Sequence, residues 1–192
     1  MKLNAAPRIL LAAGLCAAAL IGLVVSEGAA RQSGQEVLLP LEAVDPRSLL
    51  SGHYVQLSLT QRLDPSAACP AYADGEWVAL RQDGERHVAA GGAASREEAQ
   101  LIGLPVKGTL TCQPPVVGGD GVEPADGWVT LYLGIERFHA NQADAMRIER
   151  LLRQRDADEA SRVFAIVSIG RDGRARLKGL RIDGERLELS WL

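Results

Sequence analysis

The stretch that decides the fold class is Val163-Phe164-Ala165-Ile166-Val167-Ser168-Ile169, which is almost wholly apolar and rich in β-branched residues. Such a run is typical of a central strand that is buried on both faces. Arg171-Asp172-Gly173-Arg174 provides a turn after it, and Asp183-Gly184 provides a second turn. The end of the chain is therefore predicted to form a three-stranded antiparallel meander.

Between these two turns the alternation of apolar residues changes phase. Ala175 and Leu177 alternate with each other, but Leu180 and Ile182 are out of phase with them. Gly179 lies at the change of phase. Because one extra residue in a strand shifts all later side chains to the other face, the sequence predicts a β-bulge at this point.

Alternating apolar and polar residues indicate further strands upstream. Residues 54–60 alternate cleanly, and Trp77–Leu80 and His87–Ala89 flank an Asp83-Gly84 pair that favours a hairpin. Other strands are expected at residues 36–41, where Pro40 indicates a sheet edge, and at 106–112, 128–133 and 187–191. The Gly- and Pro-rich residues 113–127 are expected to form a long surface loop.

One soluble helix is predicted, from Asn141 to Arg155. Asn141 can cap it, and Ala145, Ile148 and Leu152 lie on one helical face. About nine strands and one helix predict a mainly β, β-rich α+β domain. The expected architecture is an antiparallel sandwich or partly open barrel with one packed helix, preceded by one transmembrane helix.

The N-terminal segment is an uncharged apolar run from Ile9 to Val25, preceded by Lys2 and Arg8. The cationic flank favours a cytoplasmic N-terminus with the rest of the chain outside. A retained membrane helix needs about 17–25 apolar residues, whereas a cleaved signal peptide has an apolar region of about 7–15 residues and a small-residue site. Gly28-Ala29-Ala30 can serve as that site. We divide the chain into an anchor (1–26), a tether (27–35) and a periplasmic domain (36–192), with cleavage left open.

Composition argues against several classes of function. Without Lys2 and Arg8, 19 basic residues remain against 24 acidic ones. This excess of acidic residues argues against nucleic-acid binding, which depends on neutralising phosphates with Lys and Arg. The three histidines, His53, His87 and His139, match no metal-ligand spacing, so no metal or other cofactor is expected. The sequence carries no Walker loop, dinucleotide fingerprint or G-x-S-x-G motif.

Two cysteines, Cys69 and Cys112, lie in the part of the chain predicted to be exported. In an oxidising compartment such a pair is a disulfide candidate, and closing a loop of about 43 residues would stabilise by about 4 kcal/mol. The alternative is a pair of reduced thiols too far apart to bond.

Residues 44–59, Val-Asp-Pro-Arg-Ser-Leu-Leu-Ser-Gly-His-Tyr-Val-Gln-Leu-Ser-Leu, resemble the core of the G-D-Y-x-x-L-x-Y (GDYXXLXY) family of membrane-anchored bacterial proteins. His53 stands where the family has Asp, and Leu59 where it has the final Tyr. Gly134-Ile135-Glu136-Arg137-Phe138 resembles the family's G-I-E-R-Y segment. The resemblance covers most of residues 36–184. It implies an inner-membrane anchor and a domain outside the cytoplasm, near multi-spanning membrane proteins, and it implies no reaction.

The two motif segments supply the candidate site, which consists of Gly52, His53, Tyr54, Leu57, Gly134, Glu136 and Arg137. In one interpretation these residues are structural, with Gly52 permitting an unusual backbone angle and Arg137 in a buried ion pair. In the other, the side chains of Glu136, Arg137, His53 and Tyr54 share one cleft, which binds a small ligand or hydrolyses a substrate. No catalytic residue is assigned.

Leu101-Ile102-Gly103-Leu104-Pro105 is similar to a segment of type I signal peptidases. Those enzymes carry their lysine base directly before it, where this chain has Ala99 and Gln100, so peptidase activity is not expected. The sequence instead favours a single-pass inner-membrane protein whose domain is an accessory or binding module for another integral membrane protein. The alternatives are the small-ligand binder or hydrolase, and a cleaved, exported soluble domain.

Overall fold

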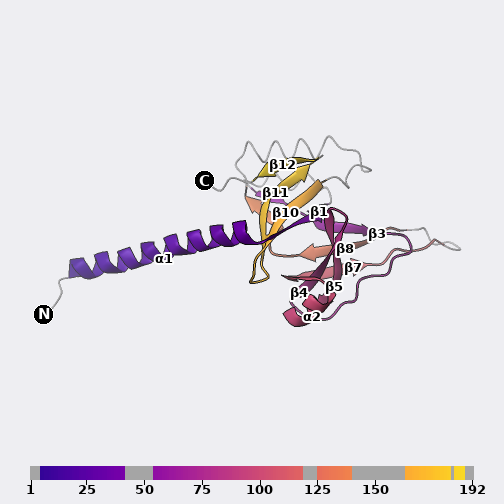
Figure 1. Cartoon of the computed structure of the whole chain (residues 1–192), viewed down its shortest axis with the longest axis horizontal. Coiled ribbons are helices and arrows are strands. Elements are labelled where there is room, and N and C mark those ends of the chain that lie inside the picture. Colours follow the sequence, from indigo (N-terminus) through magenta and orange to yellow (C-terminus); the bar gives the residue numbers. More distant parts are fainter. Residues whose placement is uncertain (1–4, 42–53, 119–124, 140–162, 183, 189–192) are drawn as a thin grey trace.

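The computed structural model describes residues 5–41, 54–118, 125–139, 163–182 and 184–188. Within these ranges the chain forms two helices and twelve strands, and the strands make antiparallel sheets that do not close into a barrel (Figure 1). The helices are α1 (Ala5–Ser33) and α2 (Arg96–Ile102). The strands are β1 (Gln35–Pro40), β2 (Tyr54–Gln56), β3 (Leu59–Leu63), β4 (Trp77–Asp83), β5 (Arg86–Ala93), β6 (Leu104–Lys107), β7 (Thr109–Gln113), β8 (Gly127–Tyr132), β9 (Arg137–His139), β10 (Val163–Ile169), β11 (Ala175–Ile182) and β12 (Glu185–Glu188).

The four-stranded sheet next to α1 confirms the predicted meander. Its order is β1-β10-β11-β12, so the apolar strand β10 is central and β1, which ends at Pro40, is an edge. The register passes from Ile166 opposite Gly179 to Val167 opposite Leu177, which leaves Lys178 as the extra residue. The predicted bulge is therefore present, one residue before Gly179.

Three smaller sheets, ordered β5-β4-β6, β3-β8-β7 and β2-β9, complete the domain. The predicted hairpin is β4–β5, with Gly84 at φ +62° in its turn. Strand β1 contacts β3 and β5, so the sheets pack around one shared core. Fully buried members of that core include Leu39, Leu80, Val129 and Val167.

The expected continuous strand over residues 106–112 is wrong, because it is divided into β6 and β7 at Gly108. Gly108 has φ +153°, and a Cβ there would lie 2.3 Å from the carbonyl oxygen of Tyr132. The break moves the chain from the sheet of β4 to the sheet of β8. The strand expected over residues 54–60 is likewise divided into β2 and β3, which belong to different sheets.

Helix α2 was not predicted. Its signal is a capping pair, in which the Ser95 hydroxyl accepts the Glu98 amide at 3.2 Å and the Glu98 carboxylate accepts the Ala94 amide at 3.0 Å. The helix predicted at Asn141–Arg155 lies outside the described residues. The predicted loop 113–127 begins as a continuation of the β7–β8 hairpin, with a bridge between Val116 and Ala125, and residues 119–124 are not described. Strand β12 contains the start of the strand predicted at residues 187–191, and residues 189–191 lie outside the described part of the chain.

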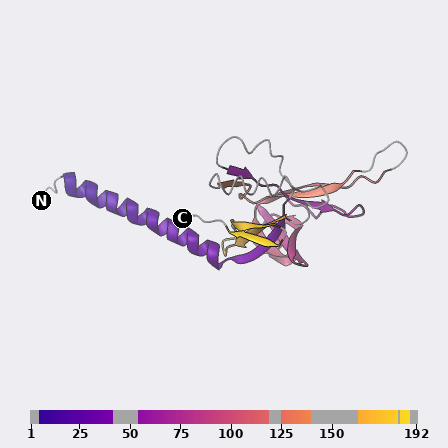
Figure 2. The ribbon, with the colours of Figure 1, turned by 90° about the horizontal axis from the view of Figure 1, so that it is seen from above.

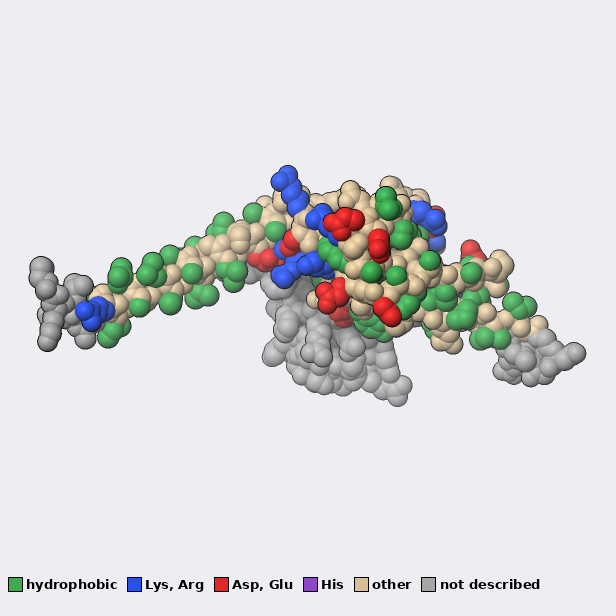
Figure 3. Space-filling model, turned by 90° about the horizontal axis from the view of Figure 1, so that it is seen from below, with side chains coloured by type: hydrophobic (Ala, Val, Ile, Leu, Met, Phe, Trp, Pro, Cys, Tyr) green, Lys and Arg blue, Asp and Glu red, His purple; other side chains and the backbone are tan. Residues whose placement is uncertain are grey.

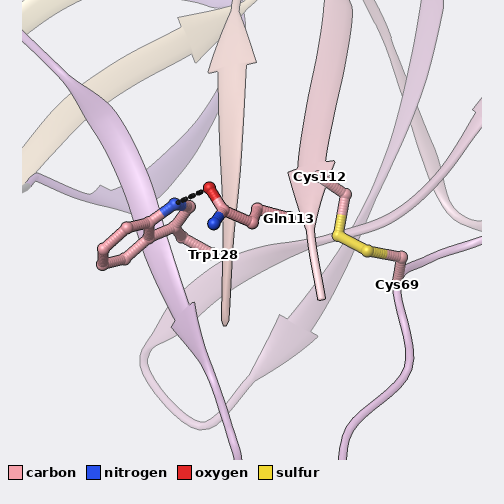
Figure 4. The surroundings of a disulfide bond; sticks show 4 residues. All are labelled: Cys69, Cys112, Gln113 and Trp128. Carbon is pink, nitrogen blue, oxygen red and sulfur yellow. Dashed lines mark hydrogen bonds between the residues drawn. A yellow bond between two sulfur atoms is a disulfide. The ribbon is translucent and has the colours of Figure 1, made fainter. Parts of the chain in front are cut away.

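The disulfide prediction is confirmed. Cys69 and Cys112 are bonded, with 5.9 Å between their Cα atoms, and the bond ties the segment before β4 to the end of β7 (Figure 4). Beside it the Trp128 indole donates to the Gln113 side-chain oxygen at 3.0 Å, across the β7–β8 pair (Figure 4).

Helix α1 projects from one end of the domain in both ribbon views (Figures 1 and 2). The helix over residues 7–33 is long and apolar enough to cross a membrane, and its most apolar stretch is not buried against the domain. The predicted tether is largely helical, because α1 continues to Ser33 and only Gly34 separates it from β1.

Candidate functional site

The two motif segments singled out in the sequence are neighbours in space. Strand β2 pairs with β9, with Val55 opposite Phe138, and the Leu57 amide extends this pair by donating to the Glu136 carbonyl at 2.7 Å. Tyr54 lies opposite His139 and Gln56 opposite Arg137. Gly52 and His53 lie outside the described residues, and the side chains of Tyr54 and Arg137 are not described.

The Glu136 carboxylate binds its own turn. Its Oε1 atom accepts the backbone amides of Leu133, at 2.5 Å, and Gly134, at 3.0 Å. Gly134 has φ +78°, a conformation that favours glycine. Ile135 in this turn is buried, and so is Leu57, whose amide donates to the Glu136 carbonyl. The geometry of Glu136 and Gly134 therefore explains this motif segment as a device that fixes a tight turn between β8 and β9.

Leu59, where the family motif has its final Tyr, faces the domain core. It is 2% exposed and lies opposite Leu131 in the β3–β8 pair. A Tyr at this position would bring a hydroxyl that needs a hydrogen-bond partner, and Leu brings no such need.

A second group of contacts, which sequence reasoning missed, joins α1 to the four-stranded sheet. The Arg176 guanidinium binds Glu27 of α1 and also Asp172, at 3.0 Å. Arg176 is 10% exposed, so it is held mostly inside this junction. The hydrogen bond from Arg176 is the main reason that the pKa of Asp172 falls to about 2, and the two carboxylates in turn raise the pKa of Arg176.

A neighbouring ion cluster lies across the same sheet. Glu36 of β1 accepts Lys178 at 2.8 Å and Arg186 at 2.7 Å, which lowers the pKa of Glu36 to about 2, with Arg186 the larger cause. Basic and acidic side chains gather on the end of the domain beside α1 (Figure 3). The bulge residue Lys178 connects the α1 junction with this ion cluster. Its side chain pairs with Glu36, and its backbone carbonyl accepts a hydrogen bond from the Arg31 guanidinium of α1 at 3.2 Å.

Of the three histidines, His87 is the one whose side chain the structure describes. His87 is half-buried, its Nδ1 atom has no hydrogen-bond partner in the described part of the chain, and burial lowers its pKa. His53 is not described, and for His139 only the backbone is. Among the residues that the structure describes, no group of three or more His, Cys, Asp and Glu side chains is placed to hold a metal.

The fold and the junction define a class of protein, a β-rich domain continuous with an N-terminal apolar helix that is long enough to cross a membrane. The chain belongs to the GDYXXLXY protein family, whose model matches residues 16–180. This range includes the C-terminal half of α1, its junction with the sheet and both motif segments. No curated protein and no solved structure matches the chain.

Proposed function

We propose that this chain is a single-pass protein of the bacterial inner membrane, with its N-terminus in the cytoplasm and its domain in the periplasm. In this proposal the domain is an accessory or binding module that acts at the membrane surface on another integral membrane protein. The observation that carries the proposal is the α1–sheet junction, in which Arg176 binds Glu27 and the carbonyl of Lys178 accepts Arg31.

The junction supports a retained anchor over a cleaved signal peptide. Cleavage after Ala30 would remove Glu27 and leave Arg176 with Asp172 alone. It would also leave Arg31 as the first residue, without the helix that positions it. The junction uses residues on both sides of the candidate cleavage site, which favours a chain that keeps its helix.

The junction also supports a partner within the same membrane. Glu27 is two residues beyond Val25, or about 3 Å along the helix axis, so Arg176 of the sheet contacts α1 just past the end of the apolar run. A domain held at this height on a short, helical connection reaches proteins embedded beside it more readily than proteins free in the periplasm.

A second candidate function, a small-ligand binder or hydrolase near Gly52–Tyr54 and Glu136–Arg137, is favoured by the pairing of β2 with β9. Against it, Oε1 of Glu136 already accepts two backbone amides. The third candidate, a cleaved soluble domain, is separated from the first by the mass of the mature chain, which would begin near Arg31.

The test is a crosslinking pulldown of the full-length tagged protein from native membranes, read by mass spectrometry. We expect one dominant multi-spanning partner. The matched comparison is Arg176→Gln against Arg62→Gln, a surface variant whose ion pair with Asp126 is exposed on both sides. Loss of the partner from Arg176→Gln alone would connect the junction with binding, whereas recovery of no partner from the wild-type protein would contradict the proposal.

A further inference from the structure

A hollow of about 470 Å³ opens beside the motif turn at Leu133 and Gly134. It lies where the four-stranded sheet approaches the sheets of β4 and β8. Polar side chains that line it are Glu76, Lys107, Thr109, Tyr132 and Arg174. Its two cations are Lys107 and Arg174, and Arg174 also lies within electrostatic range of Glu27 at the α1 junction.

A backbone hydrogen bond brings the main chains of these two residues close together. The Lys107 amide donates to the carbonyl of Gly173 at 2.8 Å, and Arg174 is the next residue in the chain. Gly173 has φ +77°, and a Cβ there would lie 2.5 Å from the Trp77 ring, so the β10–β11 turn rests on that ring. The Lys107 ammonium lies 5.6 Å from the centre of the same ring. The backbones of Lys107 and Arg174 are therefore held in place beside the Trp77 ring.

The charges around the hollow favour a bound anion. Within the described residues neither Lys107 nor Arg174 forms an ion pair, and both side chains are exposed. Two cations on one hollow repel each other, and an anion between them removes that repulsion and accepts charge-assisted hydrogen bonds. The hydroxyls of Thr109 and Tyr132 add neutral donors. Glu76 reduces the net charge of the three ionisable groups to one positive charge, which suits a phosphodiester with one negative charge.

The hollow is also close to the level of lipid headgroups. Arg176, which binds Glu27 of α1, donates to the carbonyl of Arg174 at 3.5 Å, and Asp172 accepts the Arg174 amide at 3.1 Å. The turn that carries Arg174 is therefore the turn that holds the outer end of the helix. With α1 spanning the membrane as proposed above, and a headgroup layer about 5–7 Å thick on each side of the hydrocarbon, this turn would stand at the height of the phosphate groups.

We propose that this hollow binds the phosphate of a membrane-lipid headgroup, with Lys107 and Arg174 as the phosphate ligands. The choice of a lipid source relies on the retained anchor of the proposed function, but it does not rely on a protein partner. Phosphate binding as such relies on neither.

The experiment uses the full-length protein in a maltoside detergent, which contains no phosphate. The protein is titrated with phosphatidylglycerol, with a phosphate-free galactosyl diacylglycerol and with soluble glycerol 3-phosphate. Retained lipid is counted by native mass spectrometry, and binding is followed by tryptophan fluorescence, with Trp77→Phe identifying the signal from the ring under Lys107. We expect phosphatidylglycerol to bind and the galactolipid not to bind.

The decisive comparison is Lys107→Gln/Arg174→Gln against Arg171→Gln, which removes a charge from the same turn but outside the hollow. We expect the double variant to raise the Kd for phosphatidylglycerol at least about tenfold, because two charge-assisted contacts are lost, and Arg171→Gln to change it less than about twofold. Equal losses in both variants would overturn the site in favour of general surface charge.

The soluble arm separates the two sources of phosphate. Glycerol 3-phosphate binding as tightly as the lipid would overturn the headgroup assignment. Equal retention of the galactolipid would overturn phosphate recognition altogether. Because the double variant keeps the α1 junction, its crosslinked partners in native membranes are expected to be those of the wild-type protein, so a failure here is distinguishable from a failure of the proposed function.

Discussion

The guanidinium of Arg31, near the end of α1, donates a hydrogen bond of 3.2 Å to the carbonyl of Lys178. Lys178 is the extra residue of the β-bulge in β11, so it has no Cα partner in the β10–β11 ladder. A bulge leaves backbone groups unpaired, and here one of these groups accepts a contact from the helix. The irregularity in the sheet thus serves as an attachment point for helix α1.

Replacing Arg176 with Gln should loosen the attachment. Arg176 is 10% exposed while its partners Glu27 and Asp172 are 60% and 45% exposed, so solvent screens the pairs partly. We expect a loss of about 1–2 kcal/mol in the free energy of unfolding. Thermal unfolding of the full-length protein in detergent measures this. Arg62→Gln, with an exposed partner, should change stability by less than about 0.5 kcal/mol, and equal effects of the two variants would argue against a built junction.

Acid should weaken the same sheet. The folded pKa of Glu36 and of Asp172 is about 2, below the ordinary values of 4.5 and 3.8. Because a lowered folded pKa stabilises only while the group is ionised, this contribution is complete above about pH 5 and is lost as the pH falls toward 2. Both carboxylates are partly exposed, which reduces the effect. Unfolding temperatures between pH 6 and pH 2.5 should fall less steeply for Glu36→Gln/Asp172→Asn than for the wild-type protein, and identical slopes would count against these ion pairs.

Removing the disulfide should destabilise the domain. Cys69 and Cys112 are separated by 43 positions, and closing a loop of this length is worth about 4 kcal/mol on the chain-entropy estimate. We expect Cys69→Ser/Cys112→Ser to lower the unfolding temperature of the full-length protein. The wild-type protein in strong reductant should show a similar fall. Cys16→Ser is the control, because Cys16 is a free cysteine on the exposed surface of α1 and its loss should change nothing.

Gly34 should not tolerate a side chain. A Cβ at this position would lie 2.1 Å from the Ser168 hydroxyl and 2.8 Å from the carbonyl oxygen of Ile169, and Ser168 is fully buried. We therefore expect Gly34→Ala to cost more than about 2 kcal/mol in unfolding free energy, as overpacking does. Gly28→Ala is the matched control, because nothing lies within 4 Å of a Cβ there and Ala favours a helix. The expectation fails if the two variants melt together.

Restoring the family's tyrosine should destabilise this particular core. Leu59 is 2% exposed and lies opposite Leu131, so Leu59→Tyr adds volume and a hydroxyl to a packed position. We expect a cost of about 1–3 kcal/mol, measured by chemical denaturation. Leu59→Met, which nearly conserves volume, should cost less than about 1.5 kcal/mol. A neutral Leu59→Tyr would show instead that the core keeps room for the motif residue.

Local patterns in the sequence determined several features directly. The apolar run at 163–169 requires burial on both faces, and β10 is central for that reason. The phase change near Gly179 can be met only by an extra residue, and Asp83-Gly84 admits the positive φ of a hairpin turn. Helix α2 was not predicted because a helix of seven residues shows little apolar periodicity. The spacing of Ser95 and Glu98, which is typical of a capped helix N-terminus, was the signal that could have indicated it.

Other features were decided only by the tertiary structure. Alternation shows which residues share a face, but it does not name the partner strand, so the meeting of Leu57 with Glu136 could not be derived. The break at Gly108 depends on how closely Tyr132 approaches. Arg176 reads in the sequence as one more surface charge, and it becomes the attachment of α1 only because Glu27, 149 positions away, reaches it in the folded chain. Packing between distant segments selects such partners, and no local pattern encodes them.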